Sequence, residues 1–250
     1  MQDTLYLKAT MRPLTDSSKG FSLIELLITM GILAIILGGL VSVFSSTNKT
    51  YSTQNEMINV QENARSTLDF IVRPLRNATA SSVTITGTSP NQTVSFSVIE
   101  DFSRSTGGNS TTTLIDSTKS WTSNQWSNYY VYINSGTGAM STDSQKKQIS
   151  SNTSSQLTIS SAWSTTPDST SDYKILSTHS FSISGTNLQY SKNGTTTTLS
   201  TNITGLTASK TGTDPLSRVD LTLSAQTANA RQDTGQTLSV TVNSSVKLNN

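Results

Sequence analysis

The sequence predicts an α+β fold, in which one long N-terminal helix packs on a head of antiparallel β-sheet. Three observations lead to this prediction. No charged residue occurs between Glu25 and Lys49, and that run is mostly apolar. Apolar residues then recur at intervals of three and four as far as Leu75. Beyond Ser81, short segments alternate apolar residues with Ser and Thr and are separated by Gly and Asn, as half-buried strands are.

Residues 1–20 are expected to be a leader that contributes nothing to the folded product. They carry Lys8, Arg12 and Lys19, and no further basic residue follows until Lys49. Basic residues concentrate on the cytoplasmic side of a membrane segment. The N-terminus is therefore expected in the cytoplasm and the rest of the chain outside it.

Residues 21–44 are expected to cross the membrane as a helix. At about 1.5 Å per residue this segment reaches roughly 30 Å, which is the thickness of the hydrocarbon core. Glu25 lies near its start. An acidic side chain at mid-helix costs roughly 2.5–3.5 kcal/mol on insertion scales, and less towards the interface, so this carboxylate needs a partner.

The run Lys19-Gly20-Phe21-Ser22, with Glu25 five places after the glycine, resembles the N-terminal signature of type IV prepilins and type II secretion pseudopilins. The resemblance implies that a prepilin peptidase cuts between Gly20 and Phe21, and that the new Phe21 amine is methylated. It also implies that Glu25 of one subunit faces the Phe21 amine of a neighbour as filaments form. Opposite charges in a low-dielectric bundle attract strongly and offset each other's desolvation.

Two other interpretations of the apolar run are less favoured. An ordinary signal anchor leaves Glu25 and the Gly20-Phe21 pair unexplained. A secretory signal cut near Val43-Phe44-Ser45 would need a shorter, acid-free apolar region, since such regions have about 7–15 residues.

Residues 45–80 are expected to be the amphipathic half of the same helix. The helix is predicted to run from Phe21 to about Arg73, and Pro74 should end or kink it. Gly38-Gly39 either unwinds the helix locally or allows close helix packing. The predicted buried stripe consists of Ile58, Ala64, Leu68, Ile71, Val72 and Leu75.

The stretch from Gln61 to Arg65, and on through Asp69 to Ala78, also resembles the helix end of PilW-type minor pilins and of the J-type pseudopilin. Pro74 departs from that pattern, where a polar or acidic residue is more usual. The resemblance implies a pilin-like arrangement, with the sheet lying on the second half of the helix.

Residues 81–103 and 178–250 are expected to form the β-sheet head. Asn193-Gly194 is the strongest hairpin signal, and Gly185 to Asn187 marks another turn. The predicted strands are Val83–Thr86, Val94–Ile99, Phe181–Ser184, Leu188–Ser191, Thr195–Leu199, Val219–Leu223 and Leu238–Leu248.

Residues 104–177 are expected to be an inserted β-rich module with a strand at Tyr129 to Ile133. The module holds all three tryptophans, Trp121, Trp126 and Trp163. They are expected to form its core. The alternative is a platform for a carbohydrate or a surface, and loop-borne modules often carry such functions.

The sequence offers little for catalysis, so the protein is expected not to be an enzyme and to hold no cofactor or metal. His179 is the only histidine and cysteine is absent, which excludes a zinc set and makes a nucleophile–base pair hard to build. Asp168 and Asp172 lack the spacing of a calcium loop. A net charge of +2, without a basic stripe interleaved with aromatic residues, does not indicate nucleic acid.

These features predict a non-enzymatic structural subunit, a minor pilin or pseudopilin of a type IV pilus or type II secretion filament. It is expected to sit in the inner membrane before assembly and then in a filament in the periplasm or at the cell surface. The expected partners are other pilin or pseudopilin subunits, the prepilin peptidase and inner-membrane lipid. The alternative is a membrane-tethered adhesin or ligand-binding module that forms no filament.

Overall fold

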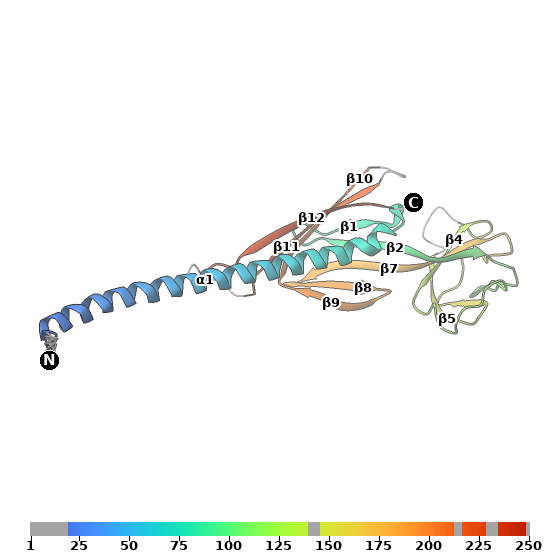
Figure 1. The fold of residues 1–250 in the computed structure, drawn as a ribbon. Coiled ribbons are helices and arrows are strands. Elements are labelled where there is room, and N and C mark those ends of the chain that lie inside the picture. Colours follow the sequence, from blue (N-terminus) through green and yellow to red (C-terminus); the bar gives the residue numbers. More distant parts are fainter. Residues whose placement is uncertain (1–19, 140–145, 213–216, 229–234, 249–250) are drawn as a thin grey trace, which may run out of the picture. The chain divides into compact units, whose positions relative to one another are not determined.

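The structure is a computed structural model that describes residues 20–139, 146–212, 217–228 and 235–248. It divides into two compact units, Met1–Tyr51 and Ser52–Asn250, which we describe separately. One long helix, α1, is followed by strands, and this confirms the predicted α+β class (Figure 1). Residues 1–19 of the expected leader lie outside the described residues.

Helix α1 spans Leu23–Arg76, and one face of its second half is buried. The predicted stripe is confirmed except at Ile58, which is 51% exposed. At about 100° per residue, Ile58 lies roughly 240° around the helix from Ala64 and so leaves the stripe, and Val60 packs against the core instead. The buried residues of the helix are Ala64, Thr67, Leu68, Ile71, Val72 and Leu75.

Pro74 does not end α1, which continues to Arg76, beyond the expected Arg73. Proline removes the N–H that would bond to Phe70 O, but the helix ends only two residues later, so a single hydrogen bond is lost near its end. The chain leaves through two tighter bonds, from Asn77 N to Pro74 O (3.1 Å) and from Ala78 N to Leu75 O (3.0 Å). A short 3₁₀ turn, η1 (Ala80–Ser82), follows.

In the described part of the chain the strands form two antiparallel sheets. The larger has nine strands in the order β1-β2-β7-β4-β5-β6-β3, with β8 paired to β7 and β9 to β8, and the smaller has the order β10-β11-β12. The strands are β1 (Thr84–Thr86), β2 (Thr93–Arg104), β3 (Thr113–Ile115), β4 (Tyr130–Ser135), β5 (Lys146–Asn152), β6 (Gln156–Ile159), β7 (Asp172–Ser184), β8 (Asn187–Lys192), β9 (Thr195–Thr201), β10 (Ile203–Thr211), β11 (Arg218–Gln226) and β12 (Ser239–Lys247).

Strand β7 connects the two halves of the larger sheet. Along one edge it pairs with β2, from Asp172 to Phe181. Along the other edge its first half pairs with β4 and its second half with β8. The proposed boundary between residues 177 and 178 therefore lies inside a single strand, and the division of the chain into domains stays a prediction.

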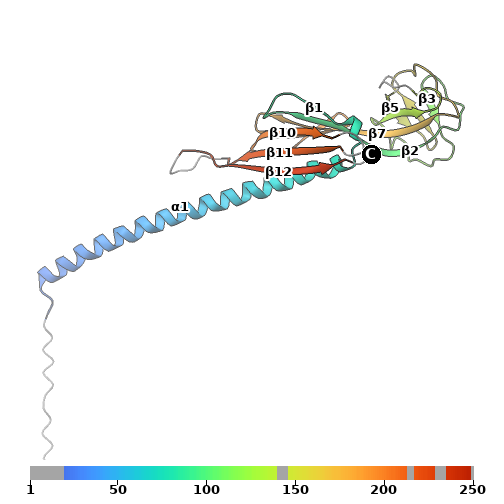
Figure 2. The same ribbon diagram turned by 90° about the horizontal axis from the view of Figure 1, so that it is seen from above.

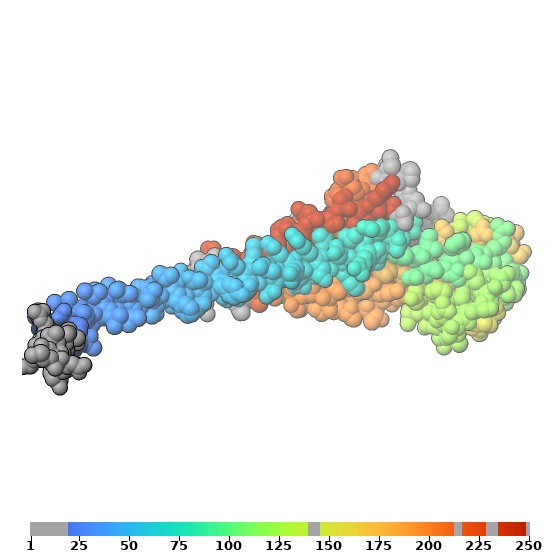
Figure 3. Space-filling model, in the orientation of Figure 1, coloured from blue at the N-terminus to red at the C-terminus, as the bar shows by residue number. Residues whose placement is uncertain are grey.

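Two hydrophobic cores lie on this framework. In the first, the buried stripe of α1 packs against residues of both sheets, including Phe181, Leu206 and Leu223. Figure 2 shows β10, β11 and β12 beside this part of the helix, and Figure 3 shows that the outer face of residues 52–76 stays uncovered. The second core belongs to β3–β6 and the start of β7, and all three tryptophans pack in it, as expected.

The turn predictions are confirmed, but the strand predictions missed β10 in the head, and in the expected module they missed β3, β5 and β6. Asn193 (φ 51°) and Gly194 (φ 86°) connect β8 to β9, and Gly185 (φ 62°) lies between β7 and β8. Strand β10 carries a register shift between Ile203 and Gly205, and such a bulge interrupts the alternation that reveals a strand in a sequence. Its hydrogen bonds to β11 define it instead.

Candidate functional site

The N-terminal segment places the expected cleavage bond just before the helix. Gly20, Phe21 and Ser22 precede α1, and Leu26 N donates to Ser22 O (3.1 Å), which makes Ser22 the N-cap residue. The Gly20–Phe21 bond therefore lies outside the hydrogen-bonded helix. A new terminus at Phe21 would begin immediately beside the first turn.

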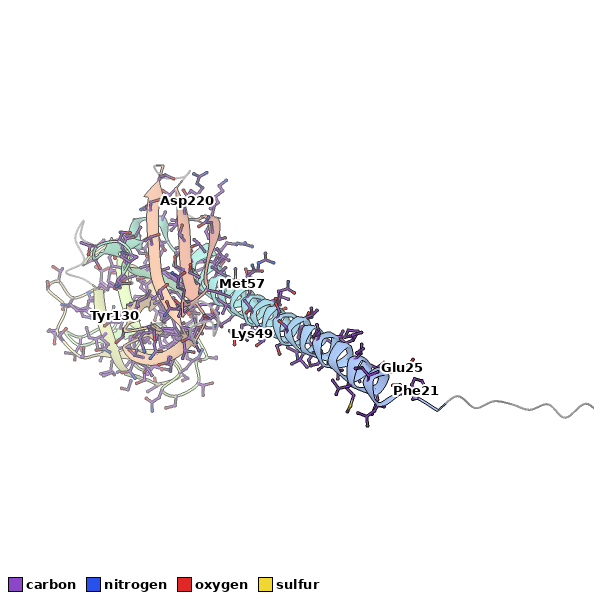
Figure 4. All side chains as sticks on the ribbon, turned by 90° about the vertical axis from the view of Figure 1, so that its left-hand side faces the viewer. Phe21, Glu25, Lys49, Met57, Tyr130 and Asp220 are labelled. Carbon is purple, nitrogen blue, oxygen red and sulfur yellow. The ribbon has the colours of Figure 1, made fainter. Side chains whose placement is uncertain are left out.

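Glu25 lies in the first turn of α1, and Figure 4 shows it with Phe21 at the start of the helix. The positive end of the helix dipole favours a carboxylate there. Ser22 and Glu25 have the spacing of a capping box. Within the part of the chain that the structure describes, however, the Glu25 carboxylate forms no hydrogen bond or ion pair. It remains available to a group from another molecule.

The first half of α1 presents apolar side chains on every face. Between Phe21 and Phe44 the large apolar residues are 50% to 81% exposed. Over the described residues, one helix is long and apolar enough to cross a membrane, and it is α1. Covering a Leu, Ile or Phe side chain gains about 1.5–3 kcal/mol, so this surface strongly favours lipid or other helices over water.

In the head, the structure brings His179 together with a serine, which the sequence did not indicate. Ser177 Oγ lies 2.8 Å from His179 Nε2 and 2.7 Å from Glu100 Oε1, and His179 Nδ1 lies 2.8 Å from the Tyr190 hydroxyl. An ionised carboxylate only accepts, so Ser177 donates to Glu100 and accepts from His179, while Tyr190 donates to Nδ1. Ser177 is fully buried and its proton faces Glu100 rather than the imidazole. This chain of bonds links β2, β7 and β8 and does not have the polarity of a nucleophile–base pair.

The His179 chain makes the stability of the head depend on pH. Burial lowers the pKa of His179 to about 4; the positive charge of Lys192 adds to this effect and the negative charge of Glu100 opposes it. The unfolded chain then takes up a proton first as the pH falls. The free energy of unfolding is therefore unaffected by His179 above about pH 6.5. It falls as the pH drops from about 6.5 to about 4, by up to about 3 kcal/mol in all.

We expect His179→Gln to flatten this dependence. Urea unfolding of the full chain in detergent, followed by tryptophan fluorescence at pH 7, 5 and 4, measures it. The wild type should lose stability over that range by up to about 3 kcal/mol more than the variant. Equal losses in both proteins would show that His179 is not the titrating group.

The two aspartates considered for calcium are engaged within the chain. Asp168 accepts bonds from Thr170 N (2.8 Å) and Thr170 Oγ1 (2.6 Å), which closes a turn. Asp172 accepts from Arg104 Nε (2.7 Å) and from Ser135, and these hydrogen bonds, that of Arg104 first, lower the pKa of Asp172 to about 2. Among the described residues, no group of three or more His, Cys, Asp or Glu side chains is placed to hold a metal ion.

Comparison with known families bears on the N-terminal segment. A family model described as the prokaryotic N-terminal methylation motif matches residues 16–41. The chain carries the methylation motif of prepilins. The matched segment contains Gly20, Phe21 and Glu25 and is consistent with the type IV pilin and pseudopilin family, which is structural and not enzymatic.

The prepilin motif implies processing by a prepilin peptidase and assembly with other pilins in general. Together with the apolar half of α1, it fits a single-pass anchor in the inner membrane. The match ends at Val41 and does not reach the head. No curated protein and no solved structure matches the chain significantly.

Proposed function

We propose that this prepilin-like chain is a low-copy structural subunit, a minor pilin or pseudopilin, of a type IV pilus or type II secretion filament. One observation supports it above the others. A methylation motif covers the start of a helix whose apolar first half is exposed on all faces and whose first turn holds Glu25, a carboxylate with no partner among the described residues. A helix of this kind needs both an apolar environment and a positive partner.

Assembly would satisfy both needs at once. Cleavage between Gly20 and Phe21 creates an amine at the end of the helix, and Glu25 of a neighbouring subunit pairs with it. Each charge then offsets the desolvation of the other in the low dielectric of a helix bundle. The apolar side chains of residues 21–44 pack against neighbouring helices, so the bundle is held by packing and its register is set by the ion pair.

The head favours a low-copy position. It contains a second core, built from β3–β6 and the start of β7, in addition to the core on α1. Such a bulky head would crowd a close-packed shaft. A position at or near a filament tip leaves room for it, and co-purification with pilus or with secretion subunits would identify the machine.

The mature N-terminus tests this proposal. Mass spectrometry of the protein from peptidase-containing cells should find a chain that starts at N-methylated Phe21. Cells without the peptidase provide the control and should keep residues 1–20 attached. A functional protein that retains its first twenty residues, or one that begins near Ser45, would contradict the proposal.

The alternative is a membrane-tethered adhesin or ligand-binding module that does not assemble. A groove on the head with two lysines and several hydroxyl groups favours it. In that case Glu25 has no role beyond the anchor, and its replacement leaves surface display and binding intact.

A further inference from the structure

Aromatic and basic residues alternate across four neighbouring strands of the larger sheet. Phe102 on β2 is opposite Lys174 on β7, Lys174 is opposite Tyr132 on β4, and Tyr132 is opposite Lys146 on β5. Residues directly opposite on antiparallel strands project from the same face of the sheet. The four side chains therefore form one row on one face.

This row borders a groove of about 420 Å³. The groove is lined by the hydroxyls of Ser82, Thr84 and Ser97, by the apolar Ile99 and Leu176, and by Tyr132 and the two lysines of the row. We call it the lysine groove. It combines hydroxyl groups, an apolar floor and positive charge, which is the composition of a site for a polar ligand with apolar faces.

Neither lysine of the groove forms an ion pair within the described ranges. Lys146 Nζ lies 3.3 Å from Ser97 Oγ and 5.3 Å from the centre of the Tyr130 ring, the residue labelled on β4 in Figure 4. By contrast, Lys119 Nζ lies 2.6 Å from a carboxylate oxygen of Asp101. Two ammonium groups that share a concave surface attract an anion, and none of the described residues that line the groove carries a carboxylate.

Lys146 also shows that the sheet curves around the groove. In the strand order, β4 and β7 separate β5 from β2, yet Lys146 on β5 reaches Ser97 on β2. The curvature brings both lysines to the same concave surface as Ser82, Thr84 and Ser97.

We propose that the lysine groove binds an acidic saccharide, a sugar chain that carries carboxylate groups. The ammonium groups of Lys146 and Lys174 bind the carboxylates through charge-assisted hydrogen bonds. The exposed Thr84 hydroxyl can both donate to and accept from a sugar hydroxyl, and Ser97, which accepts from Lys146, can still donate, whereas Ser82 Oγ already donates to Thr79 O and accepts from Ser97 N. Tyr132 in the groove lining presents its ring to the apolar face of a sugar, and Phe102, which is 70% exposed and lies opposite Lys174 at the end of the row, can meet a sugar that extends beyond the groove.

The same row would suit single-stranded nucleic acid less well. Nucleic-acid sites neutralise many phosphates and belong to strongly basic domains. This chain has a net charge of only +2, and the basic residues lining its groove are the two lysines. The hydroxyl groups along one side match the hydroxyl groups of sugars, which bases lack.

Binding of defined polymers by the full chain in detergent micelles tests this proposal. Polygalacturonate is the carboxylated probe, dextran is the neutral one, and oligo(dT) represents nucleic acid. We expect polygalacturonate alone to bind measurably by calorimetry, and the binding should weaken as salt is raised from about 0.05 to about 0.2 M. The double variant Lys146→Gln, Lys174→Gln should lose at least about tenfold in affinity.

Two further variants make the test specific. Lys247→Gln removes an exposed lysine from β12 in the other sheet and should not change binding. Phe102→Ser alters a side chain that is largely exposed, so it should keep the fold and weaken binding severalfold, even if the double variant is unstable. Equal binding of dextran, tighter binding of oligo(dT), the same loss in Lys247→Gln, or no binding of polygalacturonate would each overturn the proposal.

Discussion

Glu25→Gln should leave the chain in the membrane and lower its incorporation into filaments by about 100-fold or more. Glutamine keeps the size of the side chain and makes membrane insertion easier, so a failure cannot come from loss of the anchor. The Phe21 amine of the neighbour, however, loses its counter-ion in a low-dielectric bundle. Removing one partner of a buried ion pair costs about 3–5 kcal/mol, and each 1.4 kcal/mol is about tenfold in an equilibrium constant.

The measurement is the amount of the subunit in sheared filaments compared with the amount in the membrane fraction. Glu62→Gln is the matched control, since it neutralises an exposed carboxylate further along the same helix. It should assemble normally. Mass spectrometry should still find methylated Phe21 in the Glu25 variant, so that processing and assembly are separated. Normal filaments from Glu25→Gln would contradict the pairing and favour the tethered-adhesin alternative.

Gly136→Ala should destabilise the head by about 2–5 kcal/mol. Gly136 follows β4 and has a φ of 76°, a conformation that costs a residue with a Cβ roughly 1–2 kcal/mol. A Cβ built there would lie 2.0 Å from Thr170 O and 2.5 Å from Thr170 C. Backbone atoms cannot rotate away, so the loops must separate, at a further cost of about 1–3 kcal/mol.

Gly185→Ala is the control for the clash. Gly185 has a φ of 62°, and a Cβ there would meet nothing within 4 Å. It should cost only about 1–2 kcal/mol, the price of the backbone conformation alone. Urea unfolding followed by tryptophan fluorescence compares the two variants. The three tryptophans lie in the second core, to which β4, the strand before Gly136, also contributes. Equal effects of the two substitutions would show that the contact with Thr170 is not tight.

Several features of the head could be read from local sequence. The stripe of α1 follows from helical periodicity, and the Asn193-Gly194 turn follows from the preference of both residues for positive φ. The prediction that Ile58 belongs to the buried stripe was wrong, because an apolar residue alone does not decide which side of a helix faces the core. The expected end at Pro74 was wrong, because the helix continues to Arg76 and ends through the bonds from Asn77 N to Pro74 O and from Ala78 N to Leu75 O. A kink at Pro74 stays a prediction.

The sequence by itself determined a helix long and apolar enough to span a membrane, the position of Glu25 in its first turn and the β-rich character of the head. These properties depend on composition and on short-range periodicity, which a chain carries wherever it folds. Only the tertiary structure decided that β7 serves both cores and that Phe102, Lys174, Tyr132 and Lys146 lie in one row. That row depends on the register of strands distant in sequence, and register follows from packing of the whole sheet rather than from any local signal.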